Sequence, residues 1–475
     1  MATIFETEDS VFFVGGTGTK AGNVNAGGCT KAWYDANYTA LTDIMSSNGA
    51  ALIAEVNCTY THSSTRITKS GAFGNAKVGM VAYIAGTNIT IGRYKITAVD
   101  PSGNYVDVSG IVATGDNTDT TINVGGAFDK LQNALDNTEA SNYGVDIFTN
   151  KGETFSAAED QIDVDTGGGN GSANTWKRII GIDDSGAELP RGSYVTIDAN
   201  NKAAHVFVVN DLNNIEFRHI YAYNAGSGKY GWYYSSGTTV YGLTLKDCKS
   251  TDCDYGIYMS GSVIRGIAVV GGYYSGDVRA ILFGSAYNYS LIGAEVDVTA
   301  SNQAIWCGGS GTGLIIGCII RKNGSGDGIY HNGGGLLFVV NNTFFKVANG
   351  IAFNHSNLKL VEYNNIFYIQ SASSGKAINR TSGSIAYSDY SCLHAIDGEP
   401  TANGRWGGGG KPKHAIEEDP GFEDYLYYRP LNPKVLRGGK LDWRGEPSLM
   451  GSNLQKYQFA QRARMMSFGR LPVIR

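Results

Sequence analysis

One short pattern recurs through residues 230–380 and constrains the fold more than any other feature of the chain. A small residue followed by a branched or aromatic one returns at Gly231, Gly256, Ala280, Ala304, Gly328, Gly350 and Ala377, with offsets of 25, 24, 24, 24, 22 and 27 residues. A second apolar series follows about 11 residues later in each period: Leu243, Ile267, Leu291, Ile315, Val339 and Val361. Internal repetition on this scale predicts a repeat architecture.

The length of the period selects among repeat architectures. A propeller blade needs about 40 residues, and a leucine-rich repeat carries a fixed Leu and Asn signature that is missing here. Two or three short strands in about 24 residues fit one coil of a parallel β-helix, whose coils stack about 4.8 Å apart. Residues 145–395 then predict about 10 coils. Stacking also predicts an asparagine ladder at a turn, because Asn341-Asn342 and Asn364-Asn365 lie 23 residues apart.

The rest of the chain predicts further parts around this all-β array. Residues 77–108 alternate apolar and polar side chains between turn sequences, which is typical of a small antiparallel sheet or barrel. Residues 127–137 have one apolar helical face and predict a helix that caps the β-helix. The predicted parts are 1–29, an N-terminal strand and Gly-rich loop; 30–124, an inserted small β domain; 125–398, the cap helix and β-helix; and 399–475, a Pro/Gly-rich basic extension.

Composition limits the function. A formal charge of −5 over 475 residues argues against nucleic-acid binding by the whole molecule. Without a basic-apolar leader or a run of 18 apolar residues, we expect neither a signal peptide nor membrane insertion. The seven cysteines show no metal-ligand pairing, so buried free thiols, synthesis in a cytoplasm, no metal and no cofactor are expected.

Several segments carry a resemblance to a known family. They are residues 11–18 (VFFVGGTG), 127–135 (AFDKLQNAL), 145–155 (VDIFTNKGETF), 364–367 (NNIF), 419–424 (DPGFED) and 428–431 (YRPL). These segments resemble the right-handed parallel β-helix proteins of the pectate-lyase-like superfamily, including tailspike-type virion proteins of phages. In that family the cap helix closely follows the opening strand, so the intervening residues 30–124 are interpreted as an insertion. The scaffold serves lyases, hydrolases, epimerases and non-catalytic virion proteins, and the resemblance therefore implies a fold and not an activity.

The period places a few charged residues together. Asp254, Asp277 and Arg279 fall close to one another, and Asp327 falls two coils from Arg279. A glycoside hydrolase needs two carboxylates, and a polysaccharide lyase needs a base and often calcium. These four residues are the catalytic candidates. The alternative is a surface turn cluster in which Asp stabilises the corner and Arg279 balances the charge.

Aromatic residues and the basic tail supply the binding candidates. The candidates for stacking on sugar rings, or for filling an interface between parallel rods, are Trp232, Tyr233, Tyr234, Tyr273, Tyr274, Tyr287 and Tyr289. The candidates for docking on a partner are Arg462, Arg464, Phe468, Arg470 and Arg475. The same tail could instead cap the β-helix.

The sequence thus predicts a structural, surface-exposed bacteriophage virion protein of tailspike, fibre or head-decoration type. We expect a homotrimer that contacts other virion proteins through its C-terminal extension and recognises host surface polysaccharide. Two alternatives stay open: a polysaccharide depolymerase, either lyase or glycoside hydrolase, and a non-catalytic carbohydrate-binding protein.

Overall fold

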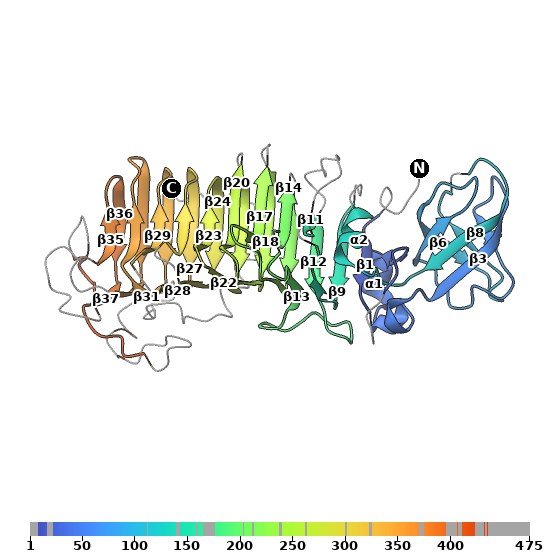
Figure 1. The fold of residues 1–475 in the computed structure, drawn as a ribbon, viewed down its shortest axis with the longest axis horizontal. Helices are drawn as coiled ribbons and strands as arrows, with labels where there is room; N and C mark the ends of the chain where they lie inside the picture. Colours follow the sequence, from blue (N-terminus) through green and yellow to red (C-terminus); the bar gives the residue numbers. More distant parts are fainter. Residues whose placement is uncertain are drawn as a thin grey trace. The chain divides into compact units, whose positions relative to one another are not determined.

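The computed structural model is almost entirely β (Figure 1). It describes residues 8–16, 22–111, 113–138, 143–157, 160–164, 176–202, 204–210, 213–236, 240–261, 264–299, 302–322, 325–369, 375–395, 406, 411–422, 432 and 435. The chain divides into a first unit (Met1–Glu153, Ile162–Ile197 and Leu212–Ile220) and a second unit (Thr154–Gln161, Asp198–Asp211 and Tyr221–Arg475).

The first unit contains a small barrel and the opening strands of the solenoid. Its elements are β1 (Ser10–Val14), β2 (Cys29–Thr30), α1 (Lys31–Asn37), η2 (Leu41–Asp43), η3 (Ser47–Gly49), β3 (Ile53–Tyr60), β4 (Arg66–Thr68), β5 (Val81–Ala85), β6 (Gly92–Val99), β7 (Tyr105–Val108), β8 (Asn117–Val124), α2 (Leu131–Asp136), β9 (Val145–Thr149), β11 (Ile162–Val164), β12 (Lys177–Gly181) and β15 (Ile215–Arg218). The chain crosses between the units within β10 (Glu153–Thr154), β13 (Val195–Asp198) and β16 (Ile220–Tyr223).

Strands β3 to β8 confirm the predicted small antiparallel β domain. They form a closed barrel in the order β3-β4-β7-β6-β5-β8, so no edge strand is left unpaired. Side chains alternate between the interior and the surface, and Tyr60, Tyr94 and Ile122 are buried inside. The Tyr60 hydroxyl donates to the carbonyl of Ser64 at 3.0 Å, which satisfies the polar end of a buried ring.

The predicted helix over 127–137 is present but shorter. Helix α2 begins at Leu131 and buries Leu131, Ala134 and Leu135. Phe128 lies before it, because the Phe128 backbone N–H donates to the carbonyl of Phe13 at 2.7 Å and so extends the pairing of β1.

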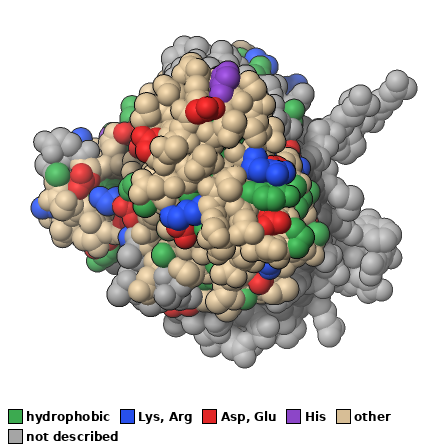
Figure 2. Space-filling model, turned by 90° about the vertical axis from the view of Figure 1, so that its right-hand side faces the viewer, with side chains coloured by type: hydrophobic (Ala, Val, Ile, Leu, Met, Phe, Trp, Pro, Cys, Tyr) green, Lys and Arg blue, Asp and Glu red, His purple; other side chains and the backbone are tan. Residues whose placement is uncertain are grey.

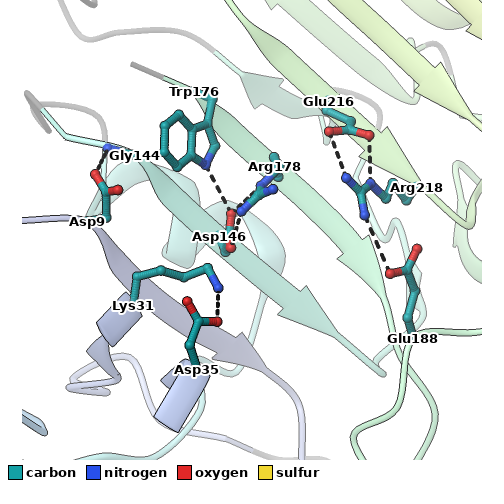
Figure 3. Close-up of polar contacts among 10 residues, drawn as sticks. All are labelled: Asp9, Lys31, Asp35, Gly144, Asp146, Trp176, Arg178, Glu188, Glu216 and Arg218. Atoms are coloured by element: carbon teal, nitrogen blue, oxygen red, sulfur yellow. Dashed lines mark hydrogen bonds and ion pairs between the residues drawn. The ribbon is translucent and has the colours of Figure 1, made fainter. Parts of the chain in front are cut away.

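Charged side chains line the parallel strands β9, β12 and β15 (Figure 3). Arg178 grips the buried Asp146 with two hydrogen bonds of 2.5 and 2.6 Å. On the neighbouring strand, Arg218 binds Glu216 in the same two-pronged way and also reaches Glu188 at 3.5 Å. The face shown in Figure 2 likewise carries acidic and basic side chains interspersed among polar ones.

The second unit is a parallel β-helix with three sheets. Sheet 1 contains β18 (Val240–Lys246), β21 (Ile264–Val270), β24 (Ala286–Ile292), β27 (Gly311–Ile316), β30 (Gly335–Val340), β33 (Leu358–Tyr363) and β36 (Ser384–Asp389). Sheet 2 contains β19 (Lys249–Thr251), β22 (Tyr273–Gly276), β25 (Glu295–Val298), β28 (Ile319–Lys322), β31 (Thr343–Val347), β34 (Ile366–Ile369) and β37 (Cys392–Ala395). Sheet 3 contains β14 (Phe207–Asn210), β17 (Tyr230–Ser236), β20 (Tyr255–Gly261), β23 (Arg279–Phe283), β26 (Ile305–Cys307), β29 (Asp327–His331), β32 (Asn349–Phe353) and β35 (Lys376–Arg380).

Sheet 3 confirms the first repeat series residue by residue. Its register pairs Trp232 with Ile257, Ile257 with Ile281, and so on through Ile305, Ile329, Ile351 and Ile378. These residues are all buried. The residue after the small one in each repeat therefore points into the core.

The second repeat series is wrong in two places. Ile267 pairs with Tyr289 and not with Leu291, because the register shifts twice between Ile264 and Ile267. Val339 pairs with Glu362 and not with Val361. Glu362 is fully buried and accepts hydrogen bonds from Asn365, Ser388 and Ser391. Burial raises the pKa of its carboxyl.

One corner repeats between sheets 1 and 2. The residue that follows each sheet 1 strand has a positive φ: Asp247, Gly271, Gly293, Gly317, Asn341, Asn364 and Tyr390. The next residue is small or polar, and most of these residues are completely buried: Cys248, Gly272, Ala294, Cys318, Asn342, Asn365 and Ser391. Gly and Asn recur at the first position because they tolerate a left-handed backbone at low cost.

The predicted asparagine ladder occupies the second position of this corner. Asn342 Oδ1 accepts from the backbone N–H of Cys318 at 2.9 Å. Asn365 Oδ1 accepts from the backbone N–H of Asn342 at 2.9 Å and from its side-chain Nδ2 at 3.1 Å. Ser391 Oγ closes the series on the backbone N–H of Asn365 at 3.0 Å. Buried polar groups on successive coils are thereby satisfied by one another.

The solenoid has about eight turns, fewer than the 10 expected. Its opening coils are longer than the period, because Val145 pairs with Lys177 and Lys177 with Ile215, steps of 32 and 38 residues. A uniform step of about 24 therefore overcounts them.

The described part of the C-terminal extension packs on the last coils. Ile416 exchanges backbone hydrogen bonds with Ser391 and Leu393, both at 2.9 Å. Val435 is buried against Ile366 and Cys392. This part of the extension therefore acts as a cap. None of the described helices is long and apolar enough to cross a membrane.

Replacing Asn365 with Ala should destabilise the protein by about 2–4 kcal/mol, because it leaves the Asn342 N–H and the Val339 carbonyl buried without partners. Urea unfolding followed by circular dichroism measures the change. The control Asn357→Ala alters an exposed asparagine and should stay within about 0.5 kcal/mol of wild type. Equal effects would show that the ladder adds nothing to stability.

Candidate functional site

The outer face of sheet 3 carries a column of large side chains. Because side chains alternate along a strand, the residue after each core residue points outward. Tyr258, Trp306 and Tyr330 take this position and are half-buried, while their neighbours Ile257, Ile305 and Ile329 are fully buried. The Trp306 ring lies against Gly308, where a Cβ would come within 2.4 Å of the indole. The rings are thus held on a rigid backbone.

Five rings meet at the first strands of this face, and we call them the tyrosine cluster: His205, Tyr230, Tyr233, Tyr255 and Tyr258. Tyr230 and Tyr258 stack at 4.3 Å with an interplanar angle of 5°. Tyr255 meets Tyr258 edge-on at 5.0 Å, and His205 stacks on Tyr230 and Tyr233, each at 4.6 Å. Partial exposure leaves part of this aromatic surface open to solvent.

His205 is neutral within the cluster. Its Nδ1 accepts a hydrogen bond from the backbone N–H of Tyr230 at 3.2 Å. Burial, with a smaller contribution from Lys229, lowers the pKa of the imidazole to about 4. At neutral pH the ring therefore behaves as a further flat, uncharged surface.

A ladder of polar side chains runs beside the aromatic column, where the sheet 3 strands begin. Arg279 donates from Nε and Nη2 to Gln303 Oε1 at 3.2 and 3.1 Å, and from Nη1 to the Tyr255 hydroxyl at 3.3 Å. Further along, Asn349 Nδ2 donates to Asp327 Oδ1 at 2.7 Å. Burial raises the pKa of Asp327.

An acidic hollow of about 300 Å³ lies at the corner between sheets 2 and 3. It is lined by Asn201, Asn224, Ala225, Ser227, Asp252, Cys253, Asp254 and Asp277. Backbone hydrogen bonds between coils hold this corner, because Asp277 N donates to the carbonyl of Cys253 at 2.9 Å and Arg279 N to that of Asp254 at 3.1 Å.

The three carboxylates of the hollow differ in their partners. Asp254 Oδ2 accepts from the backbone N–H of Gly228 at 2.7 Å, and Asp252 Oδ2 accepts from Thr251 Oγ1 at 2.7 Å. The Asp277 carboxylate accepts no hydrogen bond from any described residue. Partial burial raises the pKa of Asp277, and the negative charges of Asp254 and Asp252 raise it further. A carboxyl of this kind suits proton donation.

The structure brings only some of the predicted catalytic residues together. Asp254 and Asp277 share the hollow, and Arg279 joins the adjacent ladder. Asp327 does not line the hollow and instead binds Asn349. In the part of the chain that the structure describes, no group of His, Cys, Asp or Glu side chains could hold a metal ion.

Four of the predicted aromatic contacts are wrong. Trp232, Tyr234, Tyr274 and Tyr289 are between 0% and 3% exposed. They are core residues, because each falls on the inward phase of its strand. The other three point outward on different sheets: Tyr233 on sheet 3, Tyr273 on sheet 2 and Tyr287 next to Arg265 beside sheet 1. They do not form a single surface.

The residues that sequence reasoning missed are Tyr230, Tyr255, Tyr258, Trp306, Tyr330 and His205. A usable signal was present for three of them, because Tyr258, Trp306 and Tyr330 each follow a core residue of the first repeat series. His205 gave no such signal, since it precedes the regular repeats. The tail residues Arg462, Arg464, Phe468, Arg470 and Arg475 lie outside the described residues.

Comparisons with known proteins yield similar solved structures alone. No protein-family model and no curated protein sequence matches the chain. The tailspike gp61 of Pseudomonas phage phi297 aligns at 13% identity and a TM-score of 0.30 over 80% of this chain, which spans 64% of the tailspike's length. The catalytic domain of a GH87 α-1,3-glucanase in complex with tetrasaccharides aligns at 9% identity and a TM-score of 0.20, over 73% of this chain and 84% of the glucanase.

Adjacent residues on β17 should respond oppositely to truncation. Trp232→Ala should cost about 3–5 kcal/mol of stability, because the indole is 1% exposed in the core. Tyr233→Ala should cost about 1 kcal/mol, since its ring lies on the outer face. Thermal unfolding of both variants measures the difference, and a larger loss for Tyr233→Ala would reverse the inward and outward assignment.

Proposed function

We propose that this chain is a bacteriophage surface protein that binds host surface glycans along the outer face of sheet 3. The observation that carries the proposal is the tyrosine cluster with its outward continuation at Trp306 and Tyr330. Sugar rings present apolar faces that stack on aromatic side chains, while their hydroxyls need hydrogen-bond partners. The polar ladder of Arg279, Gln303 and Asn349 supplies such partners beside the rings.

The acidic hollow supports a second candidate function, glycoside hydrolysis. A hydrolase uses a protonated carboxyl on the leaving oxygen and a second carboxylate as base or nucleophile. The raised pKa of Asp277 suits the acid, and Asp254 is the nearest candidate for the other role. The Gly228 hydrogen bond to Asp254 fits a turn-stabilising role equally well. Glycan binding without turnover is therefore the function that the geometry supports best.

Side-by-side trimers form part of this proposal. The outer face of sheet 1 presents half-buried apolar side chains in neighbouring columns: Val270, Ile292 and Ile316 in one, and Leu314, Phe338 and Val361 in the other. Contiguous exposed apolar area of this kind supports association with another protein surface. We propose that this face packs against other copies of the chain and that the C-terminal extension contacts other virion proteins.

Binding to capsular polysaccharides should depend on Tyr258. Tyr258→Ala should weaken binding by about tenfold or more, because stacking of one aromatic ring contributes roughly 1–3 kcal/mol. Tyr241→Ala, which removes a 48% exposed tyrosine from sheet 1, is the control and should bind like wild type. Biolayer interferometry on a panel of immobilised capsular polysaccharides measures both, and equal affinity of Tyr258→Ala and wild type would remove the proposed surface.

A hydrolase arm uses the same panel. Release of reducing ends by wild type, abolished in Asp277→Asn while binding persists, would make the chain a depolymerase. Binding without release by either protein would leave it a glycan-binding protein.

Light scattering of the full chain should give the mass of a trimer. Phe338→Glu should shift it to monomer, since the substitution places a charge within the apolar face, whereas Thr312→Glu at the margin of sheet 1 should not. A monomeric wild type would rule out the trimer. Immunoelectron microscopy of phage particles tests the virion location, which absence of label from intact particles would contradict.

A further inference from the structure

Arg279 differs from most arginines of the described chain in its partners. Four arginines pair with carboxylates: Arg66, Arg178, Arg218 and Arg321. All three hydrogen bonds of the Arg279 guanidinium go to neutral groups, the Gln303 amide oxygen and the Tyr255 hydroxyl. Arg279 forms no ion pair with any residue that the structure describes. Its positive charge is therefore uncompensated at short range.

These neutral contacts hold the guanidinium in one orientation. Gln303 takes two of its N–H groups and Tyr255 takes a third, so two of the five donors remain for another partner. The Tyr255 ring, 6.0 Å from the guanidinium carbon, adds a cation–π contact. A half-buried guanidinium that is already fixed loses little side-chain freedom when it binds an anion.

Arg279 also lies where a bound glycan would pass. It opens β23 in register with Tyr255, and three residues later Leu282 pairs with Tyr258 and Trp306 in the outward column. The acidic hollow lies on its other side. The carboxyls there influence one another, since the pKa of Asp277 responds to Asp254 and Asp252.

We propose that Arg279 binds an anionic substituent of the glycan, a carboxylate, sulfate or phosphate group, and so selects acidic over neutral polysaccharides. The proposal rests on the glycan-binding function of sheet 3. Charge-assisted hydrogen bonds from guanidinium to such groups are short and strong, and an uncharged sugar hydroxyl cannot replace them.

The experiment compares glucuronate-containing capsular polysaccharides with their carboxyl-reduced neutral forms. Wild type should prefer the acidic form, and Arg279→Gln should lose about 10- to 100-fold in affinity for it while binding the neutral form unchanged. Arg279→Lys keeps the charge without the planar fork and should retain intermediate affinity. Arg265→Gln is the matched control, because Arg265 is an exposed arginine between Tyr241 and Tyr287 on another sheet.

Competition identifies the anion. Displacement by free glucuronate would assign a carboxylate, and displacement by inorganic sulfate or phosphate would assign those groups. Equal affinity of wild type for acidic and neutral forms, or equal losses in Arg279→Gln and Arg265→Gln, would overturn the role of Arg279 and leave glycan binding intact. Binding of no glycan by the wild type would instead overturn the glycan-binding function and this inference with it.

Discussion

The structure depends on backbone hydrogen bonding between coils that are in register. Parallel strands of neighbouring coils pair residue for residue, so each position of one coil sits directly over its counterpart in the next. Once that register is set, an inward position must be apolar on every coil, or its polar atoms must find partners along the stack. Isoleucine meets both the packing and the strand requirement, which explains the column from Ile257 to Ile378.

The corner between sheets 1 and 2 meets the same constraint with polar atoms. The backbone turns left-handed there, and the following residue is buried too close to the neighbouring coil for a large side chain. Cys248, Ala294 and Cys318 solve this with small side chains. Asn342 and Asn365 solve it with amides that bind the coil before them. Near the C-terminal end, Glu362 replaces the aliphatic residue of its column and is satisfied by Asn365, Ser388 and Ser391.

The outer faces are free of this core constraint and therefore hold the chemistry. On sheet 3 the outward phase became aromatic, with Arg279 and Gln303 beside it, and the neighbouring corner gathered Asp252, Asp254 and Asp277. A rigid sheet positions such groups without loops, so the geometry of the face follows directly from the register of the core. The ordered backbone beneath the rings reduces the entropy that binding must overcome.

The sequence by itself determined the β-helix, its period, the barrel before it and the asparagine ladder, because each depends on local spacing repeated many times. It also placed Asp254, Asp277 and Arg279 near one another. Only the tertiary structure decided which aromatics face out. A one-residue change of phase exchanges core and surface, as it does between Trp232 and Tyr233, and a bulge such as that before Ile267 changes the phase without a mark in the composition. The pairing of Arg279 with neutral groups was equally invisible, since it depends on which side chains of three coils reach one another.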